Sequence, residues 1–166
     1  MHFLTPLAVC ENNTSVLHDK CIDELYIPAK NYFHKSQIKV FRDSRGLILR
    51  FYTDDFLAEY YCLSKKTMES IFLIKTFLAK IKNTAIIEVH VHKLSSTDSL
   101  DMKLWEISTV VANNIEDAIE KDNRELANRT HSVGYGEFLP EKNPPNNGGK
   151  LSGRVDIIIL CNISGE

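Results

Sequence analysis

The chain has 166 residues, of which 43% are hydrophobic and 25% are charged, a composition typical of one globular domain with a real core. The formal net charge is −2, so no overall positive field favours binding to nucleic acid or to anionic lipid. No apolar run reaches the roughly 18 residues of a membrane-spanning helix. The opening segment lacks a basic start and contains Pro6, and it therefore predicts no signal peptide.

The four cysteines, Cys10, Cys21, Cys62 and Cys161, show no C-x-x-C spacing, which argues against a zinc or redox motif. Cys62 and Cys161 lie in apolar strings and are predicted to be buried thiols. Cys10 and Cys21 could pair in an oxidising compartment. The sequence leaves the redox state of the cysteines open.

Residues 1–35 are predicted to form an irregular N-terminal extension, because the stretches ENNTS and IPAKN break any regular period. The domain itself is expected over residues 36–166. It opens with two strand segments, residues 38–41 and 47–52. The Asp-Ser-Arg-Gly turn between them predicts a β-hairpin.

A helix is predicted over residues 65–82, with Ser64 as its cap. Its apolar residues recur at helical spacing and predict one buried stripe, formed by Met68, Ile71, Phe72, Phe77, Leu78 and Ile81. The segment TAIIEVHVHKL then predicts a strand, because apolar and polar residues alternate along it. Ile87, Val89 and Val91 form the apolar set, and Glu88, His90 and His92 form the polar set.

A second helix is expected over residues 102–121, with a stripe of Trp105, Ile107, Ser108, Val111, Ala112, Ile115 and Ile119. A short strand THSVGY follows, then a loop rich in Pro, Asn and Gly, then a strand over residues 155–161. The order β-β-α-β-α-β-β predicts an α+β sandwich with both helices on one face of a mixed sheet. The connection lengths imply parallel pairing between the strands that the helices join.

Several segments carry a resemblance to a known family. VGYGEFLPEKN followed by GRVDIIIL is similar to the end of an OmpA-like domain, where a G-Y-G-E-x-x-P-x-x-N turn precedes an N-R-R-V-E-I strand. LWEISTVVANNI resembles the family helix N-W-E-L-S-x-x-R-A, and IIEVHVHKL matches the I-x-V-x-G-H-T-D strand. RDSRGLILRFYTDDF resembles the opening strand, particularly in the flagellar stator protein MotB. The resemblance covers residues 38–160 and implies the OmpA-like β-α-β-α-β-β arrangement.

The resemblance implies non-covalent attachment to peptidoglycan through the carboxylate of a diaminopimelate-bearing stem peptide. Such a ligand needs a guanidinium for its carboxylate and a carboxylate for its ammonium group. In the family, an Arg of the helix and the Asp of G-H-T-D supply them. Both are replaced here, and the degenerate positions are Leu94, Leu104, Val111 and Gly153. The polar residues left as candidate ligand contacts are His92, Asp98, Asp101, Ser108 and Arg154.

Other sites receive less support. His90 and His92 share a strand face, which is a possible metal-binding pair. A zinc site needs further ligands, and His131 is the obvious third candidate. The favoured interpretation is that one of the two strand histidines hydrogen-bonds within the fold and the other faces solvent. Trp105 could stack on a sugar, although its place in an apolar stripe favours the core. No catalytic motif, cofactor site or metal site is predicted, and the sheet offers no basic aromatic face for nucleic acid.

The first hypothesis is therefore a non-enzymatic anchoring module of the periplasm or cell envelope, of the flagellar stator type. Its expected partners are peptidoglycan, an envelope protein and a second copy of the chain. The alternative keeps the fold but loses peptidoglycan binding, which leaves a protein-interaction or dimerisation module. In that case Leu94, Leu104 and Val111 pack together or form an apolar patch.

Overall fold

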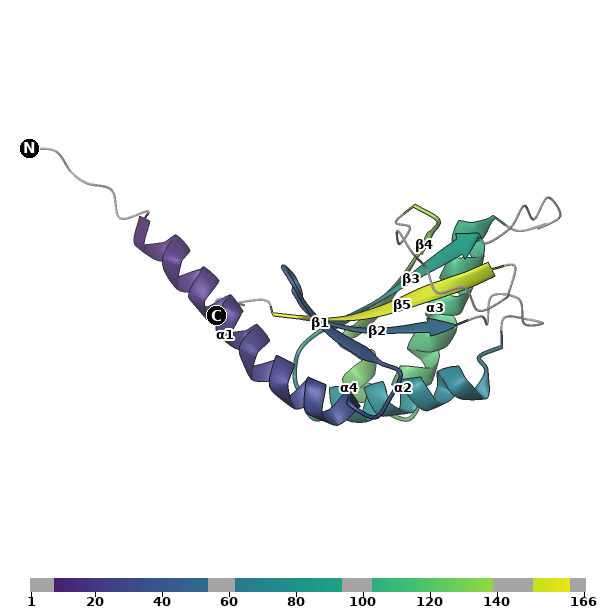
Figure 1. Ribbon diagram of the computed structural model, residues 1–166, viewed down its shortest axis with the longest axis horizontal. Coiled ribbons are helices and arrows are strands. Elements are labelled where there is room, and N and C mark those ends of the chain that lie inside the picture. Colours follow the sequence, from purple (N-terminus) through teal and green to yellow (C-terminus); the bar gives the residue numbers. More distant parts are fainter. Residues whose placement is uncertain (1–7, 54–61, 94–102, 139–150, 162–166) are drawn as a thin grey trace, which may run out of the picture.

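The computed structural model describes residues 8–53, 62–93, 103–138 and 151–161. Helices and a five-stranded sheet pack into two layers, with the helices on one face of the sheet (Figure 1). This confirms the predicted α+β class with a mixed sheet. The elements are α1 (Ala8–Phe33), β1 (Lys39–Asp43), β2 (Gly46–Thr53), α2 (Lys65–Leu78), β3 (Ala85–Lys93), α3 (Leu104–Glu120), α4 (Arg124–Ala127), β4 (Thr130–Gly136) and β5 (Leu151–Leu160).

The strands lie in the order β1-β2-β5-β3-β4. β3 and β4 are parallel neighbours, as expected for strands joined by the α3 crossover. The same expectation is wrong for β2 and β3, because β5 inserts between them and pairs antiparallel with both. The last of the described strands therefore lies at the centre of the sheet.

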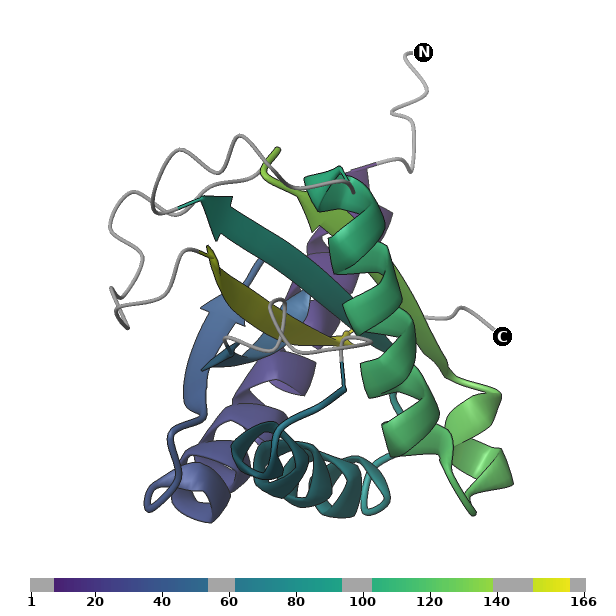
Figure 2. The ribbon, with the colours of Figure 1, turned by 90° about the vertical axis from the view of Figure 1, so that its right-hand side faces the viewer.

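Figure 2 shows the helices and the sheet from the end of the molecule. The buried core lies between these two layers. Alternate residues of β2, β3 and β5 fill it, together with one face each of α2 and α3. The stripe predicted for α2 is partly wrong, because Met68 and Phe72 are exposed. Thr67 and Ser70 are buried in their place, and hydrogen bonds satisfy both: Thr67 Oγ1 lies 2.9 Å from Thr53 Oγ1, and Ser70 Oγ accepts from Gln37 at 3.1 Å.

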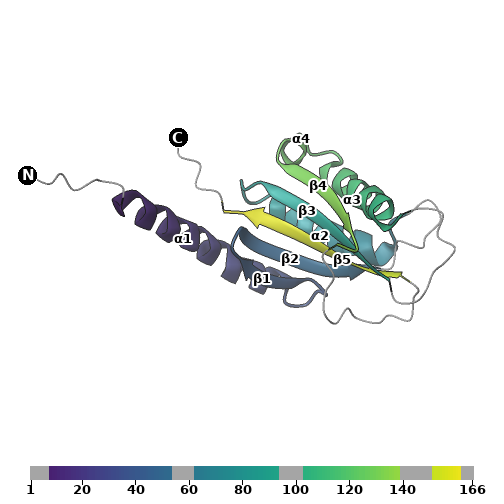
Figure 3. The same cartoon turned by 90° about the horizontal axis from the view of Figure 1, so that it is seen from above.

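The prediction that residues 1–35 are irregular is wrong for the described part, because Ala8–Phe33 form the 26-residue helix α1. The N-terminal half of α1 projects beyond the sheet (Figure 3). Its C-terminal half packs on the core through Ala29 and Phe33, and the Phe33 ring lies 5.3 Å from that of Phe77. The boundary at residue 35 remains a prediction.

A disulfide joins Cys21 of α1 to Cys161 beyond β5, across 140 positions of sequence. The prediction that Cys161 is a thiol is therefore wrong, and Cys62 is exposed, not buried. The suggested Cys10–Cys21 pairing is also wrong, since Cys21 is taken. None of the helices in the described part of the chain combines the length and apolar character needed to cross a bilayer.

Candidate functional site

The start of α3 packs tightly against the end of β4, and two glycines make this possible. A Cβ on Gly134 would lie 2.3 Å from the backbone N of Thr109. Gly136 has φ +56, and a Cβ on it would lie 2.9 Å from the backbone N of Trp105. The buried Ser108 hydroxyl accepts from the Gly136 amide at 2.8 Å and donates to the Trp105 carbonyl at 2.9 Å. The Gly-Tyr-Gly motif therefore fixes how the turn after β4 approaches the first turn of α3.

Replacing Gly134 with alanine is expected to lower the free energy of unfolding by about 1–3 kcal/mol, because the new methyl group meets helix backbone that has no room to move. Urea denaturation measures the change. Val133→Ala on the same strand is the control, because it removes atoms; it is expected to cost about 1 kcal/mol or less. Equal effects of the two substitutions would show that the close approach is not what selects glycine.

Trp105 lies at the surface of this junction with 47% of its area exposed, so its predicted place in the core is wrong. The other six residues of the predicted α3 stripe are buried. The Glu106 carboxylate accepts from the backbone N–H of Lys103 at 3.0 Å and closes the first turn. The junction of Trp105, Ser108 and Gly136 is hereafter called the α3–β4 junction.

The positions that carry the family's charged clamp are apolar in structure as well as in sequence. Val111 has no exposed area and belongs to the core, and Leu104 is half-buried against it. Gly153 is buried in β5, where it pairs with Thr53 and Val91. Leu94 lies outside the described residues. The side chain of Val111 therefore packs in the core.

The structure brings only some of the predicted contact residues together. Ser108 belongs to the α3–β4 junction, and the backbone of His92 pairs with Ser152 at the end of β3. Arg154 lies elsewhere: Val155 faces the helices, so Arg154 projects from the opposite face of the sheet. Asp98 and Asp101 lie outside the described residues.

That opposite face holds a buried ionic network that the sequence analysis missed. The Arg50 guanidinium donates to both oxygens of Asp156, at 2.6 and 2.9 Å, and Arg154 Nε lies 3.0 Å from the same carboxylate. Glu88 accepts from Arg45 at 2.7 Å. Glu88 and Asp156 are 5% and 3% exposed, so opposite charges compensate each other where water does not. Charged residues at alternate positions of neighbouring strands were the available signal.

His90 belongs to this network and is 1% exposed, so the prediction that one of the two strand histidines faces solvent fails at His90. Its ring stacks on Tyr135 at 5.1 Å, and its Nε2 lies 3.7 Å from Glu88 Oε2. His131 sits at the far end of β4, opposite Ile86, so it does not join His90 in a metal site.

The atoms of Glu88, His90 and Asp156 come within 4.8 Å of one another, a spacing that a metal ion could bridge. The fit fails on charge. Guanidinium groups of Arg45 and Arg50 already donate to the two carboxylates, and a cation placed among them would meet these positive charges at close range. The cluster is an ion-pair network and not a metal centre.

The pKa of Glu88 carries a pH prediction. Burial raises this pKa, but the neighbouring His90 ring and the charge and hydrogen bond of Arg45 outweigh burial and hold it below the ordinary value of 4.5. A carboxyl whose pKa is lower in the folded state stabilises the fold above its unfolded pKa. That stability is lost as the pH falls through the folded pKa.

Glu88→Gln is therefore expected to flatten the loss of stability below pH 4.5, measured as the urea midpoint across an acid pH series. The variant is also expected to have a lower urea midpoint than the wild type at neutral pH, because the neutral amide pairs less strongly with Arg45. Glu69→Gln, an exposed change on α2, is the control. A Glu88→Gln profile parallel to that of the wild type would contradict the assignment.

No family model matches the chain, and no curated protein matches it. Solved structures do. A MotB-like protein from Desulfovibrio vulgaris matches 90% of this chain and 99% of its own, with a TM-score of 0.65 and 16% identity. The cell wall anchor of the T6SS from Pseudomonas aeruginosa matches 78% of this chain and 96% of its own, with a TM-score of 0.61 and 12% identity.

An outer membrane protein from Borrelia burgdorferi B31 matches 74% of this chain and 96% of its own, with a TM-score of 0.54 and 24% identity. At such identities the likeness establishes the fold, and it agrees with the motifs in their order along the chain. The chain therefore has the OmpA-like fold of MotB-like and cell-wall-anchoring domains.

Proposed function

We propose that the chain is a non-enzymatic anchoring module of the cell envelope that binds peptidoglycan at the α3–β4 junction. The observation that carries the proposal is the exposed side chain of Trp105, whose backbone packs against Gly136 and is linked to it through the Ser108 hydroxyl. An indole face fixed by buried backbone offers the apolar side of a sugar ring a flat, low-entropy contact. The anchoring role of structural neighbours and the resemblance to peptidoglycan-binding domains support the same class of ligand.

The proposed contacts with the stem peptide differ from those of the family. A charge-assisted hydrogen bond contributes roughly 1.5–3 kcal/mol, so losing the clamp Arg and Asp weakens a diaminopimelate contact about a hundredfold or more. Val111 is fully buried, so the wild-type chain presents no cation at that position. Binding then rests on Trp105 and on the proposed polar contacts of Asp98 and Asp101.

The proposed location is the periplasm or cell envelope. The Cys21–Cys161 disulfide supports it, because such bonds form and persist in oxidising compartments. The proposed partners are peptidoglycan, an envelope protein of a flagellar stator-type assembly, and a second copy of the chain.

Co-sedimentation with purified peptidoglycan sacculi tests the proposal. Wild type is expected in the pellet, and Trp105→Ala is expected to bind about tenfold more weakly, since the lost contact is worth roughly 1.4 kcal/mol. Phe72→Ala removes another exposed aromatic, on α2, and serves as the matched control. Equal binding by the two variants would remove Trp105 from the site, and a wild type that stays in the supernatant would overturn wall binding.

The burial of Val111 favours a second candidate, a domain that has lost wall binding and acts through protein contacts. Restoring the clamp with Val111→Arg and Leu94→Asp separates the two. If the restored variant binds sacculi and wild type does not, the second candidate holds. Val110→Arg, one position along α3 and half-buried, controls for added charge, and circular dichroism checks that the buried arginine leaves the fold intact.

A further inference from the structure

Among the strands that the structure describes, β1 ends the sheet, so one side of its backbone has no partner among them. Asp43 and Gly46 flank the two-residue turn and form a hydrogen-bonded pair, after which such pairs alternate along the hairpin. Phe41 and Lys39 therefore bond to β2, while the N–H and C=O groups of Val40 and Arg42 point outward. β1 thus presents a short template for another strand.

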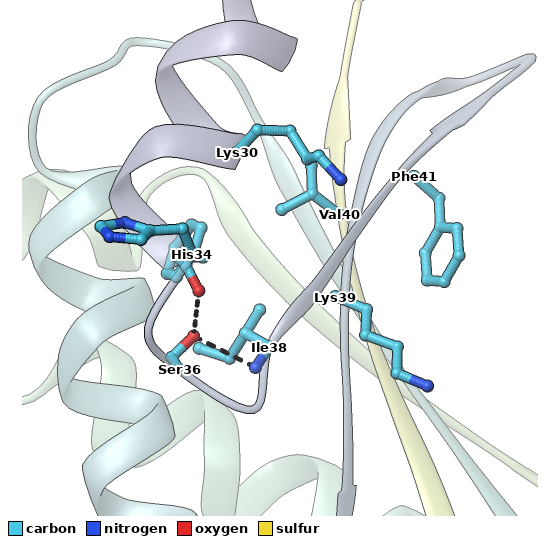
Figure 4. Close-up of a pocket in the computed structure, with 8 residues that line it drawn as sticks. Lys30, His34, Ser36, Ile38, Lys39, Val40 and Phe41 are labelled. Carbon is cyan, nitrogen blue, oxygen red and sulfur yellow. Dashed lines mark hydrogen bonds between the residues drawn. The ribbon is translucent and has the colours of Figure 1, made fainter.

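Two hollows of opposite charge lie along this edge. The first, of about 420 Å³, is lined by Lys30 and His34 on the α1 side of β1, and by Lys39 and Phe41, which project from the other side of the strand (Figure 4). The second, of about 510 Å³, lies at the other end of β1 and is lined by Asp19, Asp23 and Asp43 with Arg42. The edge is cationic where β1 begins. Where β1 ends, three carboxylates outnumber two guanidinium groups, because Arg42 pairs with Asp23 and Arg45 with Asp43.

We propose that a second copy of this chain docks here, β1 against β1, through a two-fold axis at Phe41. In antiparallel pairing about that axis, Val40 faces Arg42 of the second copy, and the outward groups of both residues meet in hydrogen bonds. Lys39 then faces Asp43 of the second copy on the outer face, and the two Phe41 rings meet between these pairs. The sequence KVFRD is self-complementary in this register.

The helix α1, which lies beneath β1, carries the same separation of charges. α1 runs under β1, with Arg42 bound to Asp23 at 2.6 Å near one end and Lys30 lining the hollow at the other. Ile27 lies between Asp23 and Lys30 in sequence and is 58% exposed. The same two-fold axis brings each cationic hollow to the acidic hollow of the other copy, the self-matching surface that a symmetric dimer requires.

This interface gives the homodimer proposed above its surface, and it does not depend on wall binding. Sedimentation equilibrium without peptidoglycan therefore tests it alone. A wild-type monomer that still sediments with sacculi overturns the interface and leaves the proposed function standing. A dimer that does not sediment with sacculi supports the interface and overturns wall binding.

Charge reversal tests the register. Lys39→Glu places a negative charge opposite Asp43 of the second copy, and the two-fold axis produces this repulsion twice in each dimer. The substitution is expected to weaken association roughly tenfold to a hundredfold. Asp43→Lys does the same against Lys39. The double variant restores opposite charges and is expected to recover association to within about threefold.

Lys66→Glu on α2 is the control and leaves association unchanged. Recovery in the double variant cannot come from damage to the fold, so it supports the proposed register directly. A double variant weaker than either single variant overturns it, as does a wild type that remains monomeric.

Crosslinking tests the axis. Phe41 is expected in a non-hydrogen-bonded pair with itself, with Cα atoms about 4.5 Å apart, which a disulfide can span. In a Cys10→Ser, Cys62→Ser background, Phe41→Cys is expected to give a covalent dimer under mild oxidation. Phe72→Cys, an exposed position on α2, is the control, and equal yields from the two would overturn the proposal.

Discussion

Replacing Asp156 with alanine is expected to lower the free energy of unfolding by about 3–5 kcal/mol, because it removes the shared anion of two largely buried guanidinium groups. Arg50 and Arg154 have side chains 18% and 11% exposed, so water replaces the lost carboxylate poorly. Urea denaturation measures the change. Asp156→Asn keeps the shape and one acceptor oxygen, and its effect is expected to lie between those of wild type and alanine.

Asp117→Ala, at an exposed position of α3, is the matched control and is expected to stay within about 0.5 kcal/mol of wild type. If Asp156→Ala is no more damaging than this control, the ionic network does not hold the outer face of the sheet together.

Removing the disulfide with Cys21→Ala and Cys161→Ala is expected to lower the free energy of unfolding by about 2–5 kcal/mol. The bond spans 140 positions and restricts the unfolded chain strongly. It also ties α1 to the end of the central strand, so hydrogen exchange should rise first in α1. Mild reduction of wild type should reproduce both effects.

Cys62→Ser is the control, because its exposed thiol forms no bond. Wild-type stability that is unchanged by reduction would contradict a structural role for the Cys21–Cys161 bond.

Local signals made much of the fold predictable. Ser64 caps α2 as expected, accepting from the Thr67 amide, and alternation located β3. α1 was missed because its stability comes from distant partners: Phe33 packs on Phe77, and Cys21 bonds to Cys161. The place of β5 between β2 and β3 was missed for the same reason, since pairing across the whole chain leaves no local mark.

Features of the candidate site that depend on distant contacts were likewise missed. The Gly-Tyr-Gly motif was recognised from the sequence, but the close approach of its glycines to α3 was not predicted, because that contact joins two segments that are separate in sequence. The exposure of Trp105 was not predicted, since an apolar stripe does not say where its end leaves the core. Glu88 and His90 were expected to form a polar face, and burial follows only once Arg45, far away in sequence, reaches Glu88.

The most direct test of wall anchoring is an NMR titration of the isotope-labelled chain with a soluble peptidoglycan fragment that carries the stem peptide. The indole N–H of Trp105 and the amide of Gly136 are expected to shift together and to saturate, with the β1 edge unaffected. A spectrum that does not change, or shifts confined to the β1 edge, would contradict peptidoglycan binding at the α3–β4 junction.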